Sequence, residues 1–339
     1  MQGPLVSVIM PLYNKKPYAA RSIKSVTDQT YKNWELIIVD DGSTDGSSDV
    51  VPMDDSRIRL IRQENRGPAA ARNKAASTAS GEYLAFIDAD DRYYPFKLER
   101  EIEFLWKENA AEWMMSAYDY LKDEITRRYY IKDINGAEIR GERRVFDDAF
   151  GQLKVAGWPS DGLFMKKTLF DCLSGFNESM RYGEITELIL RCAAMQPKVG
   201  ICGFPLYLHI DVPGSTAKVT KKNEYPLQLG RTLNMLAQKY PKYGGYLISS
   251  GYANLISYCA FLILEGRGAE ARRFLRKEFS LKRDVRWWKM WAASFLPKHF
   301  ILNLVKIFRE TNKFILQNAL RRLKKIGSVI LRSWRGLRI

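Results

Sequence analysis

Histidine and cysteine are scarce in this sequence. Its 339 residues include two histidines, His209 and His299, and four cysteines that form no C-x-x-C pair and have no histidine beside them. A zinc site or a disulfide framework is therefore not indicated, and a Ser-His-Asp triad or a thiol–imidazole pair has little material. We expect a reducing, cytoplasmic setting, with chemistry that rests on carboxylates, basic groups and backbone.

Several familiar motifs are also missing. The loops of the first hundred residues contain neither G-x-G-x-x-G nor G-x-x-x-x-G-K-[ST], which disfavours a dinucleotide-dependent dehydrogenase and a P-loop NTPase. The first eleven residues lack the charged region of a secretory signal, so we expect the protein to stay inside the cell. The longest uncharged stretch, 243–264, contains glycine, serine and asparagine, and we expect a packed helix there rather than a membrane span.

Acidic residues are rare in the last third of the chain. Residues 221–339 contain 25 basic and 6 acidic side chains, a net charge of +19, whereas residues 1–220 contain 29 and 32, a net charge of −3. This shift follows the turn signal Val212-Pro213-Gly214-Ser215. The chain therefore reads as a nearly neutral globular body followed by a strongly basic region.

Short apolar runs alternate with helical patterns over the first hundred residues, which is typical of βαβ units around a mostly parallel sheet. The predicted strands are 6–10, 34–39, 58–62 and 83–87, and the predicted helices are 17–28 and 68–79. Further along we expect a strand at 163–166, helices at 168–172 and 184–195, two strands within 199–209, and helices at 252–265 and 269–279. An open α/β sheet binds its ligand at the carboxyl ends of the strands.

Carboxylates cluster at two of these strand ends. Asp40 and Asp41 follow the second strand, where they could accept hydrogen bonds from a base or a ribose or simply form an Asp-Gly turn. Asp88, Asp90 and Asp91 follow the fourth strand, and three acids so close together repel one another unless a positive charge lies among them. Oxygen ligands suit Mg²⁺ or Mn²⁺, which bridge to diphosphates; a solvated acidic turn is the alternative.

Four motifs, in this order and at these spacings, resemble the nucleotide-sugar half of glycosyltransferase family 2, the inverting GT-A transferases. They are Val8-Ile9-Met10-Pro11-Leu12-Tyr13-Asn14, Val39-Asp40-Asp41-Gly42-Ser43-Thr44-Asp45, Asn65-Arg66-Gly67 with Ala71-Arg72-Asn73, and Phe86-Ile87-Asp88-Ala89-Asp90-Asp91. The resemblance is close over residues 4–105 and looser over 158–210. It implies an α/β fold: a GT-A domain with a Rossmann-like mixed sheet at 1–215, made of a nucleotide-sugar half (1–105) and an acceptor half (106–215), before a basic helical region at 216–339.

The resemblance also implies roles for individual residues. Those expected at the donor nucleotide are Pro11 and Tyr13 along the base pocket, Asp40 on the base, Arg72 near the nucleotide, and Asp88 at the ribose or a metal-bound water. Asp90, with Asp88, would hold Mn²⁺ or Mg²⁺, which helps a diphosphate to leave. Ordinary packing for Tyr13 and a solvated helix charge for Arg72 are the structural alternatives.

The general base departs from the family's pattern. The family places Glu-Asp after the glycine of its acceptor-side segment, and that Asp takes the proton from the acceptor hydroxyl; here the Asp position holds Ile185. Since a single-displacement inversion needs a carboxylate near the attacking hydroxyl, the remaining candidates are Glu184, Glu187 and Asp161. We favour Glu184, although a carboxylate at that position could also cap the predicted helix.

The C-terminal region reads as basic helices. Within 314–332 the residues Leu316, Leu320, Leu323, Ile326 and Ile330 recur every three or four positions among lysines and arginines, and tryptophans precede them. This pattern matches a segment lying on an anionic membrane. Nucleic acid is disfavoured because a phosphate backbone has no use for an aliphatic stripe, while helices packing on one another or on a protein partner remain an alternative.

The leading hypothesis is an inverting, metal-dependent glycosyltransferase of cell-envelope glycan synthesis. It would move a sugar from a nucleotide diphosphate sugar to a lipid-linked or polysaccharide acceptor, as in lipopolysaccharide or capsule formation, from the cytoplasmic side of the membrane. The alternative, motivated by Ile185, is a catalytically silent subunit that binds nucleotide sugars.

Overall fold

The computed structural model describes residues 3–107, 111–133, 135–153, 159–180, 183–213, 225–278 and 294. The chain forms two compact units, Met1–Tyr252 and Ala253–Ile339. The basic helix expected at 314–332 lies outside the described residues. The boundary expected near residue 215 stays a prediction.

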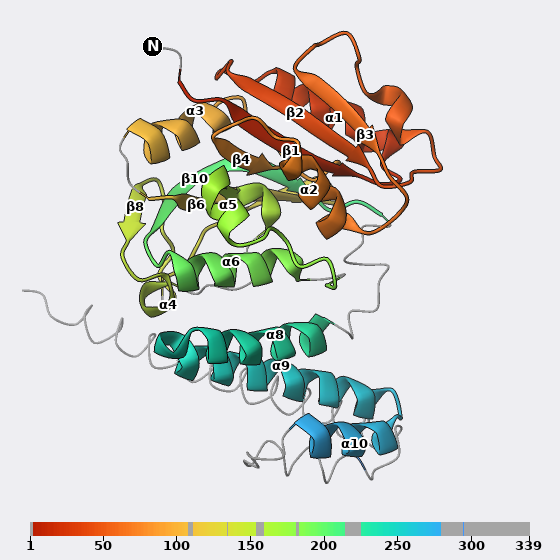
Figure 1. Cartoon of the computed structure of the whole chain (residues 1–339), viewed down its shortest axis with the longest axis vertical. Helices are drawn as coiled ribbons and strands as arrows, with labels where there is room; N and C mark the ends of the chain where they lie inside the picture. The colour runs from red at the N-terminus through yellow and green to blue at the C-terminus, as the bar shows by residue number, and fades with distance from the viewer. Residues whose placement is uncertain are drawn as a thin grey trace, which may run out of the picture. The chain divides into compact units, whose positions relative to one another are not determined.

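The described part of the first unit is built on a mixed ten-stranded sheet (Figure 1). Its strands are β1 (Val6–Leu12), β2 (Trp34–Asp40), β3 (Ile58–Arg62), β4 (Tyr83–Phe86), β5 (Arg92–Tyr93), β6 (Trp113–Lys122), β7 (Ile125–Tyr129), β8 (Arg143–Phe146), β9 (Leu163–Lys166) and β10 (Val199–Ile210). They follow the order β3-β2-β1-β4-β9-β6-β10-β5, with β7 paired to β6 and β8 to β10. The pairs among β1 to β4 are parallel, whereas β9 runs antiparallel to both β4 and β6.

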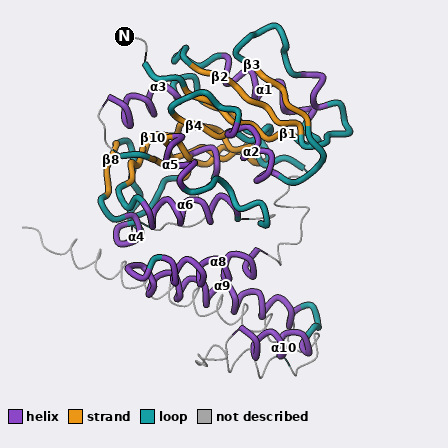
Figure 2. Tube along the Cα trace, viewed as in Figure 1, coloured by secondary structure: helices purple, strands orange, loops and turns teal. Residues whose placement is uncertain are grey.

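Helices connect these strands and continue beyond them (Figure 2). They are α1 (Lys16–Thr27), α2 (Pro68–Ser77), α3 (Lys97–Ile102), α4 (Ala149–Gln152), α5 (Lys167–Cys172), α6 (Glu184–Met195), α8 (Tyr225–Lys239), α9 (Gly244–Leu264) and α10 (Gly268–Glu278). Short turns of other helix types are η1 (Ser47–Val50), η2 (Glu103–Lys107), η3 (Ser160–Gly162) and η4 (Pro241–Tyr243).

The core lies on both faces of the sheet, which explains the continuous apolar runs in its strands. Along β1, Val8 and Met10 pack into one hydrophobic cluster and Ile9 into the other, and Ile38 and Ile37 divide in the same way along β2. The polar loops therefore begin at the carboxyl ends of strands that are buried on both faces.

The predicted fold class is confirmed, with two local differences. The two strands expected around Pro205 are one strand, β10, whose pairing with β6 shifts register on either side of that proline; proline has no N–H to donate, which favours such an irregularity. Helix α9 begins at Gly244 rather than at 252. Within this longer helix, a Cβ at Gly251 would lie 3.0 Å from the carbonyl of Gly230 in α8, so the glycine allows the two helices to pack closely.

Helix α9 is also apolar. Among the described residues, the window Leu247–Leu264 is the one long and apolar enough to cross a membrane, with mean hydropathy 1.6, and 44% of it is buried within the structure. Packed helices of soluble proteins reach these values too. The packed helix expected here therefore stays a prediction.

A buried ion pair lies beneath β5 and β10. Lys97 and Glu101, one turn apart on α3, are both fully buried and hydrogen-bonded to each other, and the Lys97 ammonium also lies 4.7 Å from the centre of the Tyr93 ring. Burial raises the pKa of Glu101 to about 7, against the lowering effect of Lys97. Its Oε2 has no hydrogen-bond partner, so Glu101 depends on Lys97 for its charge balance.

We expect Lys97→Met to lower the free energy of unfolding by about 3–5 kcal/mol at pH 8, because it leaves a buried carboxylate without its partner. A group whose folded pKa is raised loses its stabilising contribution as the pH rises through that pKa, so the deficit should shrink at pH 5. Urea denaturation at both pH values measures the effect. The matched double variant Lys97→Met/Glu101→Leu should recover most of the loss, and an equal loss in both variants would contradict the ion-pair argument.

Candidate functional site

The polar loops after β1, β2 and β4 meet at one edge of the sheet. Asp40, at the end of β2, accepts a hydrogen bond from the Ser43 backbone N–H at 2.9 Å and is 4% exposed. Its neighbour Asp41 accepts bonds from the backbone N–H groups of Arg66 and Gly67 and from the Gln63 amide, each at 2.8 Å. Asp41 therefore fixes the loop that begins α2, while Asp40 has one such contact.

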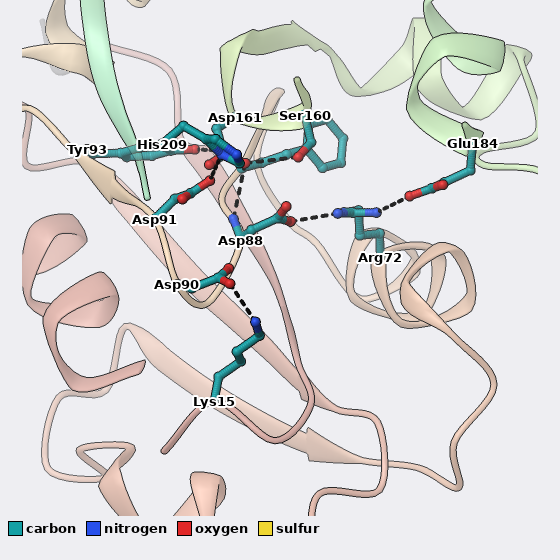
Figure 3. Close-up of polar contacts among 11 residues, drawn as sticks. Lys15, Arg72, Asp88, Asp90, Asp91, Tyr93, Ser160, Asp161, Glu184 and His209 are labelled. Carbon is teal, nitrogen blue, oxygen red and sulfur yellow. Dashed lines mark hydrogen bonds and ion pairs between the residues drawn. The ribbon is translucent and has the colours of Figure 1, made fainter. Parts of the chain in front are cut away.

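In the loop after β4, the carboxylates of Asp88 and Asp90 each pair with a different basic side chain (Figure 3). Asp90 accepts a hydrogen bond from the Lys15 ammonium at 2.5 Å, and Asp88 accepts one from the Arg72 guanidinium at 2.6 Å. The predicted repulsion among these acids is thus offset by two cations of the chain itself.

Arg72 joins the two halves of the site. From the buried side of α2 it contacts Asp88 with one nitrogen and Glu184, at the start of α6, with another at 3.0 Å. Burial alone would lower the pKa of Arg72, but the carboxylates of Asp88 and Glu184 outweigh it and raise that pKa. Arg72 is therefore a charged, buried bridge rather than a solvated helix residue.

A second polar group lies behind the loop. The His209 Nδ1 is 2.7 Å from Asp91 Oδ2, Asp91 Oδ1 accepts the Ile210 N–H at 2.7 Å, and Asp161 Oδ1 accepts the Asp88 N–H at 3.1 Å. One ligand atom each of Asp91, Asp161 and His209 lies within 4.8 Å of the others. Burial, followed by neighbouring carboxylates, raises the pKa of Asp91 and of Asp161 well above the usual value for aspartate.

The three candidates for the general base have different surroundings. One carboxylate oxygen of Glu184 accepts a hydrogen bond from Arg72, and burial raises the pKa of Glu184 despite that partner. Glu187 has both oxygens bound by Arg191, each at 2.7 Å. Asp161 is 1% exposed, and Ile185 packs against a hydrophobic core cluster.

The residues expected along the base pocket are also placed. Pro11 lies within β1, and Tyr13, in the following loop, is 46% exposed. Tyr13 is thus not part of the buried core, and its place along the base pocket stays a prediction. Pro11, Tyr13 and Asp40 all belong to the neighbouring ends of β1 and β2, which are paired in parallel at Pro11↔Val39 and Leu12↔Asp40.

The donor atoms at this edge suit Mg²⁺ or Mn²⁺, because Asp88 and Asp90 offer carboxylate oxygens beside an accessible surface. The Asp88 side chain is 34% exposed. In the Asp91, Asp161 and His209 group, by contrast, the two oxygens of Asp91 are taken by His209 and Ile210, whereas Asp161 Oδ2 is buried without a hydrogen-bond partner.

Sequence reasoning missed Lys15 and His209. Lys15 lies in a turn where two consecutive lysines give an ordinary surface signal, and nothing in its spacing points to Asp90, 75 residues away. His209 was visible only as one of two histidines. Its contact with Asp91 arises from β5 pairing with β10, which single-sequence patterns do not show.

A parallel αβ half, an antiparallel strand at its edge and acidic residues at the strand ends define the chain as a protein of the GT-A class. Residues 7–157 match the family described as Glycosyl transferase family 2. The resemblance predicted from the motifs is confirmed over these residues.

The relatives match this chain over different lengths. A Bacillus subtilis protein whose name links it to teichuronic acid biosynthesis, TuaG, is 46% identical over 112 residues, or 32% of this chain and 44% of its own. The Escherichia coli enzyme WfgD, named a UDP-Glc:alpha-D-GlcNAc-diphosphoundecaprenol beta-1,3-glucosyltransferase, is 42% identical over 125 residues, or 36% of this chain and 49% of its own. An uncharacterised glycosyltransferase of Rickettsia conorii is 27% identical over 95% of this chain and 49% of its own. The chain spans half or less of the length of these relatives.

A solved structure supports the fold. Residues 1–349 of Staphylococcus aureus TarS superpose with a TM-score of 0.58 at 17% identity, covering 85% of this chain and 78% of TarS 1–349. The same TarS fragment has been crystallised in complex with UDP-GlcNAc. At this identity the likeness concerns the fold alone.

We expect Asp41→Ala to lower the free energy of unfolding by about 2–4 kcal/mol, because it leaves two backbone N–H groups of the loop before α2 without an acceptor. Asp40→Ala should cost only about 1 kcal/mol, since it removes one such bond. Urea denaturation of the two variants makes the comparison. Equal losses of unfolding free energy in the two variants would show that Asp41 does not stabilise this loop more than Asp40 does.

Proposed function

We propose that this protein is an inverting glycosyltransferase that moves a sugar from a nucleotide diphosphate sugar to a glycan or lipid-linked acceptor of the cell envelope. The observation that carries the proposal is the meeting, at one sheet edge, of Asp40, the loop Asp88–Asp91 and the bridge from Arg72 to Glu184. The family of residues 7–157 and the named activity of WfgD support it.

The donor occupies the carboxyl ends of β1, β2 and β4 in this proposal. Pro11 and Tyr13 line the base, Asp40 accepts a hydrogen bond from it, and Asp88 holds the ribose. A uridine nucleotide is the donor we favour, because WfgD is named for UDP-Glc and TarS has been crystallised with UDP-GlcNAc.

Asp90, with Asp88, is proposed to hold Mg²⁺ or Mn²⁺ against the diphosphate. A bound divalent cation neutralises charge on the departing nucleoside diphosphate. Asp91, Asp161 and His209 form the support behind the loop, since the Asp88 N–H is fixed by Asp161 and the strand β10 by Asp91.

Glu184 is proposed as the general base. Arg72 Nη1 donates to its Oε1, while its raised pKa favours proton transfer from an acceptor hydroxyl. Glu187 instead positions α6 through Arg191, which also donates to the backbone carbonyl of Gly175 at 2.7 Å. In the single displacement, the acceptor oxygen attacks the anomeric carbon, Glu184 takes its proton and the nucleoside diphosphate leaves from the opposite side.

The acceptor and the location follow from weaker support. A diphosphoundecaprenol-linked acceptor appears in the name of WfgD, and the basic C-terminal region carries a net charge of +19 over residues 221–339. We therefore propose a lipid-linked acceptor and peripheral attachment to the anionic inner face of the cell membrane, with the protein in the cytoplasm. A silent, nucleotide-binding subunit is the less favoured function, because Glu184 offers a carboxylate beside Ile185.

We expect Asp90→Ala to abolish Mn²⁺-dependent transfer from UDP-sugars, since the cation loses its carboxylate. Transfer of radiolabelled sugar to membrane lipid extracts, with a panel of UDP-sugars, measures it. Asp133→Ala serves as the control, because it also removes an aspartate carboxylate but lies in an isolated β-bridge of the predicted acceptor half. If Asp90→Ala turns over about as fast as the control, the assignment of the cation to Asp90 is wrong.

We expect Glu184→Gln to lower the transfer rate by about 10²–10⁴-fold while UDP binding with Mn²⁺ stays unchanged. Because the base must be ionised and its pKa is raised, the wild-type rate should fall with decreasing pH already above the ordinary range of glutamate, and the variant should lose that acidic limb. Rates measured between pH 5 and 9 test this. An unchanged rate would transfer the role to another group, and UDP binding without any transfer by the wild type would favour the silent subunit.

A further inference from the structure

Lys15 is a basic residue built into the candidate site, and neither the motifs nor the comparisons give it a role. Its ammonium lies 2.5 Å from Asp90 Oδ2, and the two side chains are only 15% and 13% exposed. Figure 3 shows Lys15 reaching up to Asp90 from below, while Arg72 lies to the right beside Asp88. The contact is therefore neither a surface ion pair nor a packed core pair.

The backbone of Lys15 is fixed from both directions. Its N–H donates to Ser47 Oγ at 2.7 Å, and its carbonyl accepts the N–H groups of Tyr18 and Ala19, each at 2.9 Å. The preceding Asn14 has a φ of +49°, and its side-chain oxygen accepts the Thr44 N–H at 2.8 Å. The start of the Lys15 side chain is thus held in place, and its four-carbon stem alone is left to move.

The two basic partners of the loop differ in freedom. Arg72 is buried and divided between Asp88 and Glu184, so moving it away would leave the buried carboxylate of Glu184 without its partner. Lys15 has a flexible stem, and its ammonium contacts one carboxylate, that of Asp90. Of these two cations, Lys15 is the one that can change partner.

We propose that the Lys15 ammonium is an exchangeable counter-ion: it neutralises Asp90 before the donor arrives and binds the donor's diphosphate afterwards. This inference rests on the proposed function. A divalent ion at Asp90 repels the ammonium, and the diphosphate that accompanies the ion supplies the nearest new negative charge. An ammonium bound to phosphate then forms a charge-assisted hydrogen bond.

The exchange predicts effects of opposite sign on two ligands. Without nucleotide, Lys15→Gln should bind Mn²⁺ about 2–10-fold more tightly, because a competing ion pair of modest strength is gone. With Mn²⁺ saturating, the same variant should bind UDP about tenfold or more weakly, because a charged contact to phosphate is lost. Uridine, which has no phosphate, should bind equally to both proteins.

Lys16→Gln is the matched control, since it removes the same charge from the next, exposed residue. The full chain is used throughout, with Mn²⁺ binding followed by electron paramagnetic resonance of the free ion and nucleotide binding by calorimetry. Lys15→Arg keeps the charge and should retain most of the UDP affinity, which separates the loss of charge from a disturbed turn.

The inference is overturned if Lys15→Gln binds Mn²⁺ no more tightly than the wild type, or if its loss of UDP affinity equals that of Lys16→Gln. A loss of UDP affinity in Lys15→Arg as large as in Lys15→Gln would overturn it too. If the wild type binds no UDP even with Mn²⁺, the proposed function fails. If the wild type binds UDP and Lys15→Gln binds it equally well, only the role of Lys15 is rejected and the proposed function stands.

Discussion

The buried guanidinium of Arg72 connects parts of the chain that the sequence separates by more than a hundred positions. It binds Asp88 after β4 and Glu184 at the start of α6, and its neighbour Asn73 binds both backbone polar groups of Phe176. Because a buried carboxylate is costly without a partner, the three charges stabilise one another only together. The loop after β4 and the start of α6 are thereby held in one arrangement.

Much of this arrangement could be predicted. The strands at 58–62 and 163–166 and the helix at 184–195 begin and end where the sequence indicates, because short apolar runs, helical periodicity and turn residues leave little ambiguity there. The structure places Asp40, Arg72, Asp88 and Glu184 on or directly after the strands and helices predicted for them, while their roles stay predictions. Their pairing followed from tertiary structure, since Arg72 on a helical pattern looks like any surface arginine.

Other features could not be read from the pattern. The irregular pairing of β10 around Pro205 depends on its neighbour β6, and the close packing of α9 on α8 depends on the approach of Gly251 to Gly230. His209 and Lys15 reach the site through strand pairing and a fixed turn respectively. Each involves a contact between distant segments, where local propensity carries no information.

Strand β9 has a broader consequence. It is hydrogen-bonded to β4 on one side and β6 on the other, and it follows directly on the turn that carries Asp161. The position of that aspartate is consequently set by the sheet and not by the chain between β6 and β9. Changes in that intervening stretch during evolution would therefore leave Asp161 in place, as long as β7 and β8, which it contributes, keep their pairing with β6 and β10.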